Sequence, residues 1–198
     1  MSFQTNLPNY LTVARFILTV AFIFCLTRSG IAAAVLATLL FMLASWTDYY
    51  DGYYARKYNL ISNFGRIMDP IADKFLVLSA FFIFAQRQVI PYWMFYLIFA
   101  REVIVTGSRI TAVVKGRVLA AEMAGKCKNL TQLFAIWIIL LFIVFQESGG
   151  VALQESYQRG WLLVITALMV LTVALTVISG LSYFWNNRKI ILFPAASH

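Results

Sequence analysis

The chain of 198 residues is 62% hydrophobic and only 12% charged, with a mean hydropathy of +0.80. Soluble domains are roughly 45–50% apolar and about 25% charged, so this composition excludes an ordinary soluble, secreted or fibrous protein. The net charge of +8 does not indicate nucleic-acid binding, because the basic residues lie within apolar runs or at their ends, where they orient membrane proteins and attract anionic lipids.

The apolar runs predict an all-α, polytopic membrane protein with six transmembrane helices in one membrane-embedded catalytic domain over residues 1–198. An uncharged apolar run of about 18 residues or more is long enough to cross a hydrocarbon core of about 30 Å. Amphipathic segments at the membrane interface are expected over about residues 1–10 and 57–64. The expected helices cover about residues 11–26, 31–54, 70–85, 91–114, 122–145 and 160–185.

The charges of the loops predict the orientation of the chain. The loops after the second and fourth expected helices and the segment after the sixth hold seven basic residues, against three on the opposite side. Lys and Arg are enriched in cytoplasmic loops, so both termini and these two loops are expected to face the cytoplasm. The seven residues are Arg56, Lys57, Arg66, Lys115, Arg117, Arg188 and Lys189, and the three are Arg28, Arg87 and Arg159.

The cysteine and histidine content argues against three features. Cys25 and Cys127 lie far apart in the chain and have no metal-ligand spacing, so neither a disulfide framework nor a zinc site is expected. His198 is the only histidine and ends the sequence. Acid–base catalysis by histidine is therefore not expected.

All four aspartates of the chain, Asp48, Asp51, Asp69 and Asp73, lie within one window of 26 residues. On helices the first two are i, i+3 neighbours and the last two are i, i+4 neighbours, so each pair shares a face. A short cytoplasmic connection between the two helices would let these faces oppose each other. Four carboxylates are then expected to converge just inside the cytoplasmic membrane surface.

Converging carboxylates in a low dielectric repel one another, and divalent cations relieve that repulsion. Ligation by oxygen alone suits Mg²⁺, Mn²⁺ or Ca²⁺, and two such ions about 3.5–4 Å apart can clamp a pyrophosphate. Gly52 and the small Ala55 would let a nucleotide approach the helix backbone. In the alternative interpretation the aspartates form a solvated charge cluster with neighbouring basic residues. These are Arg56, Lys57, Arg66 and Lys74.

The aspartates belong to a longer pattern, which has the form D-x2-D-G-x2-A-R-x8-G-x3-D-x3-D. This pattern resembles the signature of the CDP-alcohol phosphatidyltransferases, and all eight of its fixed positions match. In this chain they are Asp48, Asp51, Gly52, Ala55, Arg56, Gly65, Asp69 and Asp73. The six expected helices and the cytoplasmic placement of the motif extend the resemblance over essentially the whole chain.

The resemblance implies an Mg²⁺- or Mn²⁺-dependent enzyme that transfers a phosphatidyl group from CDP-diacylglycerol to an alcohol and releases CMP. It implies that Asp48, Asp51 and Asp69 bind a two-metal centre, which Asp73 completes. Asp73 would also be the catalytic base that deprotonates the acceptor hydroxyl in a direct in-line displacement. The implied donor-binding residues are Asp48, Gly52, Ala55, Arg56, Gly65 and Asp69.

Basic residues in the fourth and fifth expected helices point to an anionic acceptor. Arg101 lies about ten residues into its helix, near mid-depth of the membrane at about 1.5 Å per residue, where a guanidinium should face a polar cavity. Arg109 follows on roughly the same face, and Lys126 and Lys128 lie at the start of the fifth helix. These four side chains could bind a phosphomonoester. Alternatively, Arg101 pairs with Glu122 and the lysines anchor the helix at the cytoplasmic surface.

Four segments are similar to the bacterial phosphatidylglycerophosphate synthases within this family. They are the opening from Asn6 to Arg15, the pair Arg101-Glu102, Gly107-Ser-Arg109 and Gly125-Lys126-Cys-Lys128. This similarity implies sn-glycerol 3-phosphate as the acceptor, a homodimer and a place in the bacterial inner membrane among its lipids. The chain departs from the subfamily at Asn129, where Thr is usual, and at Ile110, where Glu is frequent.

Two groups of alternatives stay open. The same chemistry could use another acceptor, such as phosphatidylglycerol (as in a cardiolipin synthase of this family), inositol phosphate or serine. A protein of a different class, a divalent-cation transporter, could use the four aspartates as its ion site. Transporters usually bind their ions near the bilayer midplane within repeats or broken helices, whereas these acids lie at one edge of a chain without repeats.

Overall fold

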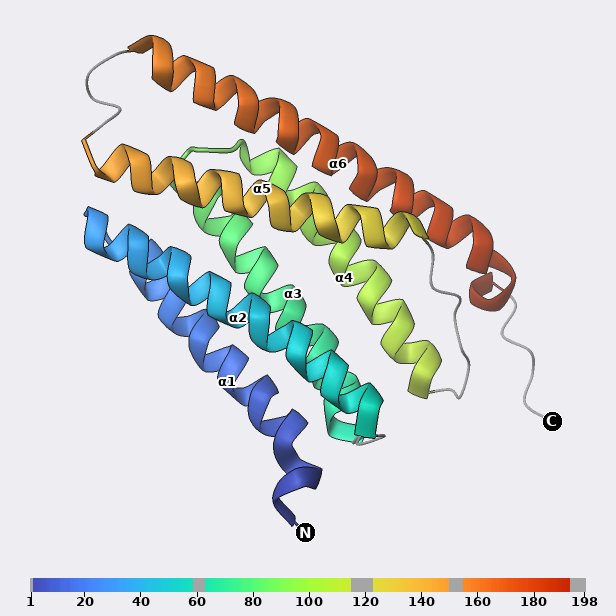
Figure 1. Ribbon diagram of the computed structural model, residues 1–198. Coiled ribbons are helices and arrows are strands. Elements are labelled where there is room, and N and C mark those ends of the chain that lie inside the picture. Colours follow the sequence, from blue (N-terminus) through green and yellow to red (C-terminus); the bar gives the residue numbers. More distant parts are fainter. Residues whose placement is uncertain (1, 59–62, 115–122, 150–154, 193–198) are drawn as a thin grey trace, which may run out of the picture.

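The computed structural model describes residues 2–58, 63–114, 123–149 and 155–192. Within these ranges the chain forms six α-helices and no strand, which confirms the all-α prediction (Figure 1). The helices are α1 (Ser2–Leu26), α2 (Ile31–Tyr58), α3 (Asn63–Gln86), α4 (Tyr92–Val114), α5 (Met123–Glu147) and α6 (Glu155–Leu192). Successive helices run up and down one bundle.

The core of the bundle is built from aromatic and aliphatic side chains of all six helices. Phe22 of α1 packs on Phe41 of α2, with 5.6 Å between the ring centroids. Phe41 in turn meets the ring of Trp137 of α5 edge-on at 5.9 Å, an arrangement that aromatic pairs favour. α3 lies against α1, α4 and α5, and α4 also contacts α6. α3 therefore packs against helices on both sides of the bundle, and α2 also contacts α5 directly.

The outer surface of the bundle is apolar. Two stretches among the described residues are long and apolar enough to cross a membrane, Cys127–Glu147 and Tyr157–Asn187, with mean hydropathies of 2.0 and 2.6. Shorter apolar helices cover Thr12–Leu26 and Ile31–Thr47. Large side chains such as Leu163 and Trp185 are exposed on α6. Exposed apolar side chains on several helices suit contact with lipid, so the protein is associated with a membrane.

Several helices are longer than the apolar runs predict. The first helix, expected from about residue 11, begins at Ser2, whereas the interfacial position of residues 1–10 stays a prediction. Phe3, Leu7, Tyr10 and Leu11 recur at helical spacing, which favours this extension. Of the segment expected over 57–64, residues 57 and 58 belong to α2 and residues 63 and 64 to α3, and the residues between them lie outside the described part of the chain. An apolar run marks the part of a helix that lies in hydrocarbon, whereas backbone hydrogen bonding continues beyond it.

A polar contact joins three turns of the chain at one end of the bundle. The Glu147 carboxylate at the end of α5 accepts a hydrogen bond from the Gly30 N–H at 2.7 Å and one from Arg87 at 3.3 Å. Arg87, which follows α3, also donates to the carbonyl of Arg28 at 2.7 Å. Gly30 has a φ of 108°, a conformation that glycine adopts without steric cost. This contact holds the ends of α1, α3 and α5 together.

Candidate active site

The two halves of the aspartate motif lie at the opposite end of the bundle from Glu147. Residues 48–56 occupy the last turns of α2, and residues 65–73 occupy the first turns of α3. α2 contacts α3, and Figure 1 shows the end of α2 beside the start of α3. The backbone therefore brings the two halves together, as the expected short connection requires.

Of the motif residues, only Asp73 has a described side chain. It is partly exposed, at 34%, and its carboxylate lies 3.0 Å from the ammonium of the neighbouring Lys74. The other predicted metal and donor residues lie in α2 and α3, but their side chains are outside the described part of the structure. They are Asp48, Asp51, Gly52, Ala55, Arg56, Gly65 and Asp69.

A buried carboxylate, Glu102 of α4, is the centre of a cluster of charges next to Asp73. Its side chain is 1% exposed. It forms ion pairs with Lys74 of α3 at 3.5 Å and with the fully buried Lys128 of α5. The amide of Gln132, one turn further along α5, donates to the same carboxylate at 3.3 Å. Glu102 thus connects α3, α4 and α5 in the interior of the bundle.

Arg101 connects the same cluster to α6. Its guanidinium lies 3.4 Å from the Glu102 carboxylate and donates a hydrogen bond to the Ser179 hydroxyl at 3.1 Å. Its side chain crosses α6 at Gly180, where an added Cβ would lie 3.1 Å from the Arg101 Cγ. The alternative partner Glu122 lies outside the described residues. Arg101 is therefore held between α4 and α6, with Glu102 as its carboxylate partner.

Gly180→Val is expected to lower the free energy of unfolding by about 1–3 kcal/mol, the usual cost of forcing extra methyl groups into a packed site. Gly160→Val, on the same helix, is the matched control, because nothing lies within 4 Å of a Cβ at that position. Thermal unfolding in detergent measures both variants. Equal melting temperatures for the two variants would contradict the close packing of Arg101 on Gly180.

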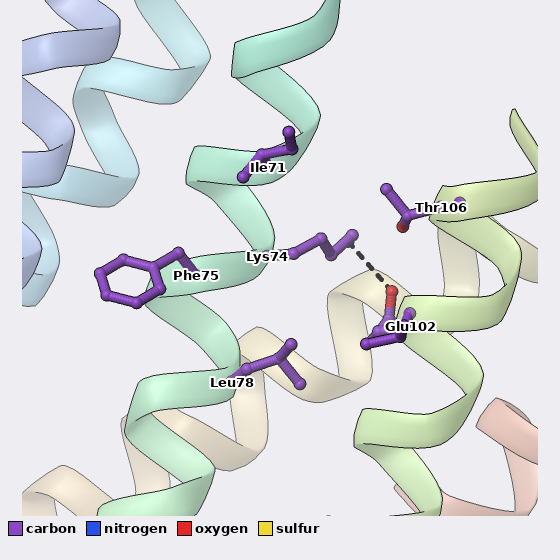
Figure 2. Close-up of a pocket in the computed structure, with 8 residues that line it drawn as sticks. Ile71, Lys74, Phe75, Leu78, Glu102 and Thr106 are labelled. Atoms are coloured by element: carbon purple, nitrogen blue, oxygen red, sulfur yellow. Dashed lines mark ion pairs between the residues drawn. The ribbon is translucent and has the colours of Figure 1, made fainter. Parts of the chain in front are cut away.

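A cavity of about 270 Å³ lies between α3 and α4 beside this cluster. Lys74 and Glu102 line one part of it, and the rest is lined by Ile71, Phe75, Leu78, Val103, Thr106 and Gly107. Figure 2 shows Lys74 reaching from α3 across the gap to Glu102 on α4. Charged groups at the boundary of an apolar cavity are typical of ligand sites.

The structure brings together some of the predicted acceptor residues. Arg101 and Lys128 meet on one carboxylate. Arg109 lies in α4 and Lys126 in α5, and their side chains are outside the described part. Lys128 is 1% exposed, so its ammonium is enclosed in this state. A ligand can contact it only after a neighbouring group has moved.

Lys74, Glu102 and Gln132 are not among the site residues that the sequence predicts. Its position in the sequence could have identified Glu102, since this acid lies within an apolar run. Acids inside membrane segments are costly and usually paired. Gln132 carries no comparable signal. Arg15 of α1 is a further buried cation, in the segment that the sequence analysis treated only by resemblance.

Comparisons with known proteins cover nearly the whole chain. The family model described as CDP-alcohol phosphatidyltransferase matches residues 5–178. A Bacillus subtilis protein named CDP-diacylglycerol–glycerol-3-phosphate 3-phosphatidyltransferase is 39% identical, over 92% of this chain and 95% of its own length. A Rickettsia felis protein of the same name is 37% identical over 96% and 99%. A probable phosphatidylglycerophosphate synthase of Mycobacterium tuberculosis is 34% identical over 90% and 79%.

Proposed function

The chain belongs to the CDP-alcohol phosphatidyltransferase family, and we infer from this that it is an enzyme of phospholipid biosynthesis. It transfers the phosphatidyl group of CDP-diacylglycerol to sn-glycerol 3-phosphate, giving phosphatidylglycerophosphate and CMP. The observation that carries this conclusion is the similarity, along nearly the full length of both chains, to relatives named for that reaction. The motif at the junction of α2 and α3 is the part of the fold that this chemistry requires.

Enzymes of this family generally depend on a divalent metal ion. We propose that Asp48, Asp51, Asp69 and Asp73 bind two Mg²⁺ or Mn²⁺ ions. The chemistry of these side chains supports this assignment, because all four aspartates offer carboxylate oxygens as ligands and the two helices that carry them are in contact. When bound, the ions would neutralise the pyrophosphate of CDP-diacylglycerol and the charge on the departing CMP. Gly52, Ala55, Arg56 and Gly65, with Asp48 and Asp69, are proposed to bind the CDP group.

In the proposed mechanism Asp73 accepts the proton of the acceptor hydroxyl. Its carboxylate is partly exposed and can be reached by a small alcohol. The hydroxyl oxygen then bonds to the phosphorus that carries diacylglycerol, and the bond from this phosphorus to the CMP oxygen breaks. A single in-line displacement needs no covalent enzyme intermediate. The proton remains on Asp73 until it is released to water.

For the acceptor we propose that Arg109, Lys126, Lys128 and Arg101 bind the phosphate of glycerol 3-phosphate. Lys128 and Arg101 already converge on Glu102, and α4 and α5 carry the other two. A phosphate dianion attracts several cations at once through charge-assisted hydrogen bonds. An acceptor without a phosphate would not supply the negative charge that pairs with these four cations.

We propose that the protein lies in the bacterial inner membrane, which its six helices span. The active site and both termini are proposed to face the cytoplasm, and the protein is proposed to form a homodimer. The up-and-down path of the described helices (Figure 1) supports a common side for the two ends. The distribution of basic loop residues supports the cytoplasmic assignment.

The purified protein is expected to release CMP from CDP-diacylglycerol when glycerol 3-phosphate and Mg²⁺ or Mn²⁺ are present. Release with serine or phosphatidylglycerol should be at least about 100-fold slower, because these acceptors lack a phosphomonoester and leave the buried cations unpaired. Release with inositol phosphate should also be slower, because the relatives are named for glycerol 3-phosphate. Faster CMP release with another alcohol would show that this alcohol is the acceptor and would leave the proposed role of the aspartates unchanged. If no acceptor led to CMP release, the assignment as an enzyme would be contradicted and the alternative of a divalent-cation transporter would be favoured.

A further inference from the structure

Glu102 has an unusual number of cationic partners for one buried carboxylate. Lys74 lies 3.5 Å from it, Arg101 lies 3.4 Å from it, and Lys128 is in direct contact with it. Lys128 and Glu102 are each 1% exposed. Burying a charge is costly unless it is paired and hydrogen-bonded. The interior of the bundle therefore contains three cations arranged around a single buried anion.

These contacts form a chain of alternating charges that crosses the bundle. Asp73 pairs with Lys74 at 3.0 Å, Lys74 pairs with Glu102, and Glu102 pairs with Lys128. The chain begins at the proposed base on α3 and ends at a proposed acceptor-binding lysine on α5. Arg101 adds a further positive charge from α4. Among the side chains that the structure describes here, three cations lie beside two carboxylates, so the cluster attracts an anion such as a phosphate.

We propose that Glu102 is a positioning residue for the phosphate of the acceptor, an inference that rests on the proposed function. Its carboxylate holds Lys74, Arg101 and Lys128 close together before the acceptor arrives, although like charges a few ångströms apart repel strongly in a low dielectric. An ammonium can donate three hydrogen bonds, so Lys128 can keep its contact to Glu102 and also donate to a phosphate oxygen once the neighbouring group that encloses it has moved. Preorganised cations bind an anion more tightly, because their convergence does not have to be achieved on binding.

A double-mutant cycle between Glu102 and Lys128 tests this role. Glu102→Gln keeps the size of the side chain and removes its charge. It is expected to raise the KM for glycerol 3-phosphate about 30-fold, within the range of one charge-assisted contact, and to change the KM for CDP-diacylglycerol less than about twofold. Lys128→Met should have a similar effect. The double variant should raise the acceptor KM by clearly less than the product of the two single effects, because Glu102 acts in part through this lysine and in part through Lys74 and Arg101.

Glu147→Gln is the matched control, because it makes the same chemical change in an ion-paired glutamate at the other end of the bundle. It should lower the melting temperature in detergent and leave both KM values unchanged. If Glu102→Gln does not fold, Glu102→Asp keeps the charge, retracts it by one methylene and should raise only the acceptor KM, by about fivefold.

Three outcomes would overturn the inference while the wild type still uses glycerol 3-phosphate. The two single effects could multiply in the double variant, the two KM values could rise equally, or the acceptor KM could fall. A fall would mean that Glu102 competes with the phosphate for Lys128. A wild type that releases no CMP with glycerol 3-phosphate would instead remove the proposed function, and this inference with it.

Discussion

Asp51→Ala is expected to abolish both transfer and nucleotide binding, whereas Asp73→Asn should abolish transfer and keep part of the nucleotide binding. Asp51 is proposed to bind metal at the donor pyrophosphate, so its loss removes the group that neutralises the donor. Asn at position 73 retains an oxygen ligand but cannot accept a proton at neutral pH. Loss of a general base alone lowers kcat by about 10²–10⁴-fold. We expect Asp73→Asn to lower kcat by at least this much.

CMP release measures the transfer, and binding of a non-reactive CDP analogue to the detergent-solubilised protein measures nucleotide affinity. Glu147→Gln serves as the control for the carboxylate-to-amide change, since Glu147 lies in the contact with Arg87 and Gly30. It should retain full nucleotide binding and full kcat. Equal loss of nucleotide binding in the Asp51 and Asp73 variants would show that Asp73 acts only as a metal ligand and would remove its assignment as the base.

Removal of divalent metal is expected to eliminate activity almost completely. Four carboxylates at the junction of α2 and α3 repel one another without a cation, and the pyrophosphate of the donor would add further negative charge. Treatment with EDTA should reduce CMP release to below about 1%, because metal-assisted charge stabilisation contributes several kcal/mol to such reactions. Mg²⁺ or Mn²⁺ added in excess should restore it.

The control for this experiment is K⁺ at matched ionic strength, which should restore nothing if a specific divalent site is required. CDP-analogue binding should disappear and return together with activity. Full activity in EDTA would contradict a metal centre formed by Asp48, Asp51, Asp69 and Asp73. It would favour the interpretation in which these residues form a charge cluster with neighbouring basic side chains.

Much of the fold could be predicted from the sequence, because the features concerned are local. Six apolar runs separated by Gly, Pro and Ser indicated six helices, and six helices are present in the described residues. The ends of α1, α2 and α3 were misplaced because hydropathy reports the depth of a helix in hydrocarbon and not the extent of its hydrogen bonding. Only two stretches among the described residues satisfy the length and hydropathy of a membrane span.

The sequence by itself determined the family and the position of the aspartate motif, because Asp48 to Asp73 form a continuous pattern whose spacing is read directly from the chain. The tertiary structure alone decided the environment of Arg101 and Lys128, which meet at Glu102 together with Lys74. These four residues come from α3, α4 and α5. Their convergence depends on how each helix is rotated and offset against its neighbours. Side-chain packing over the whole bundle sets that rotation, and the spacing of residues within a single helix does not contain it.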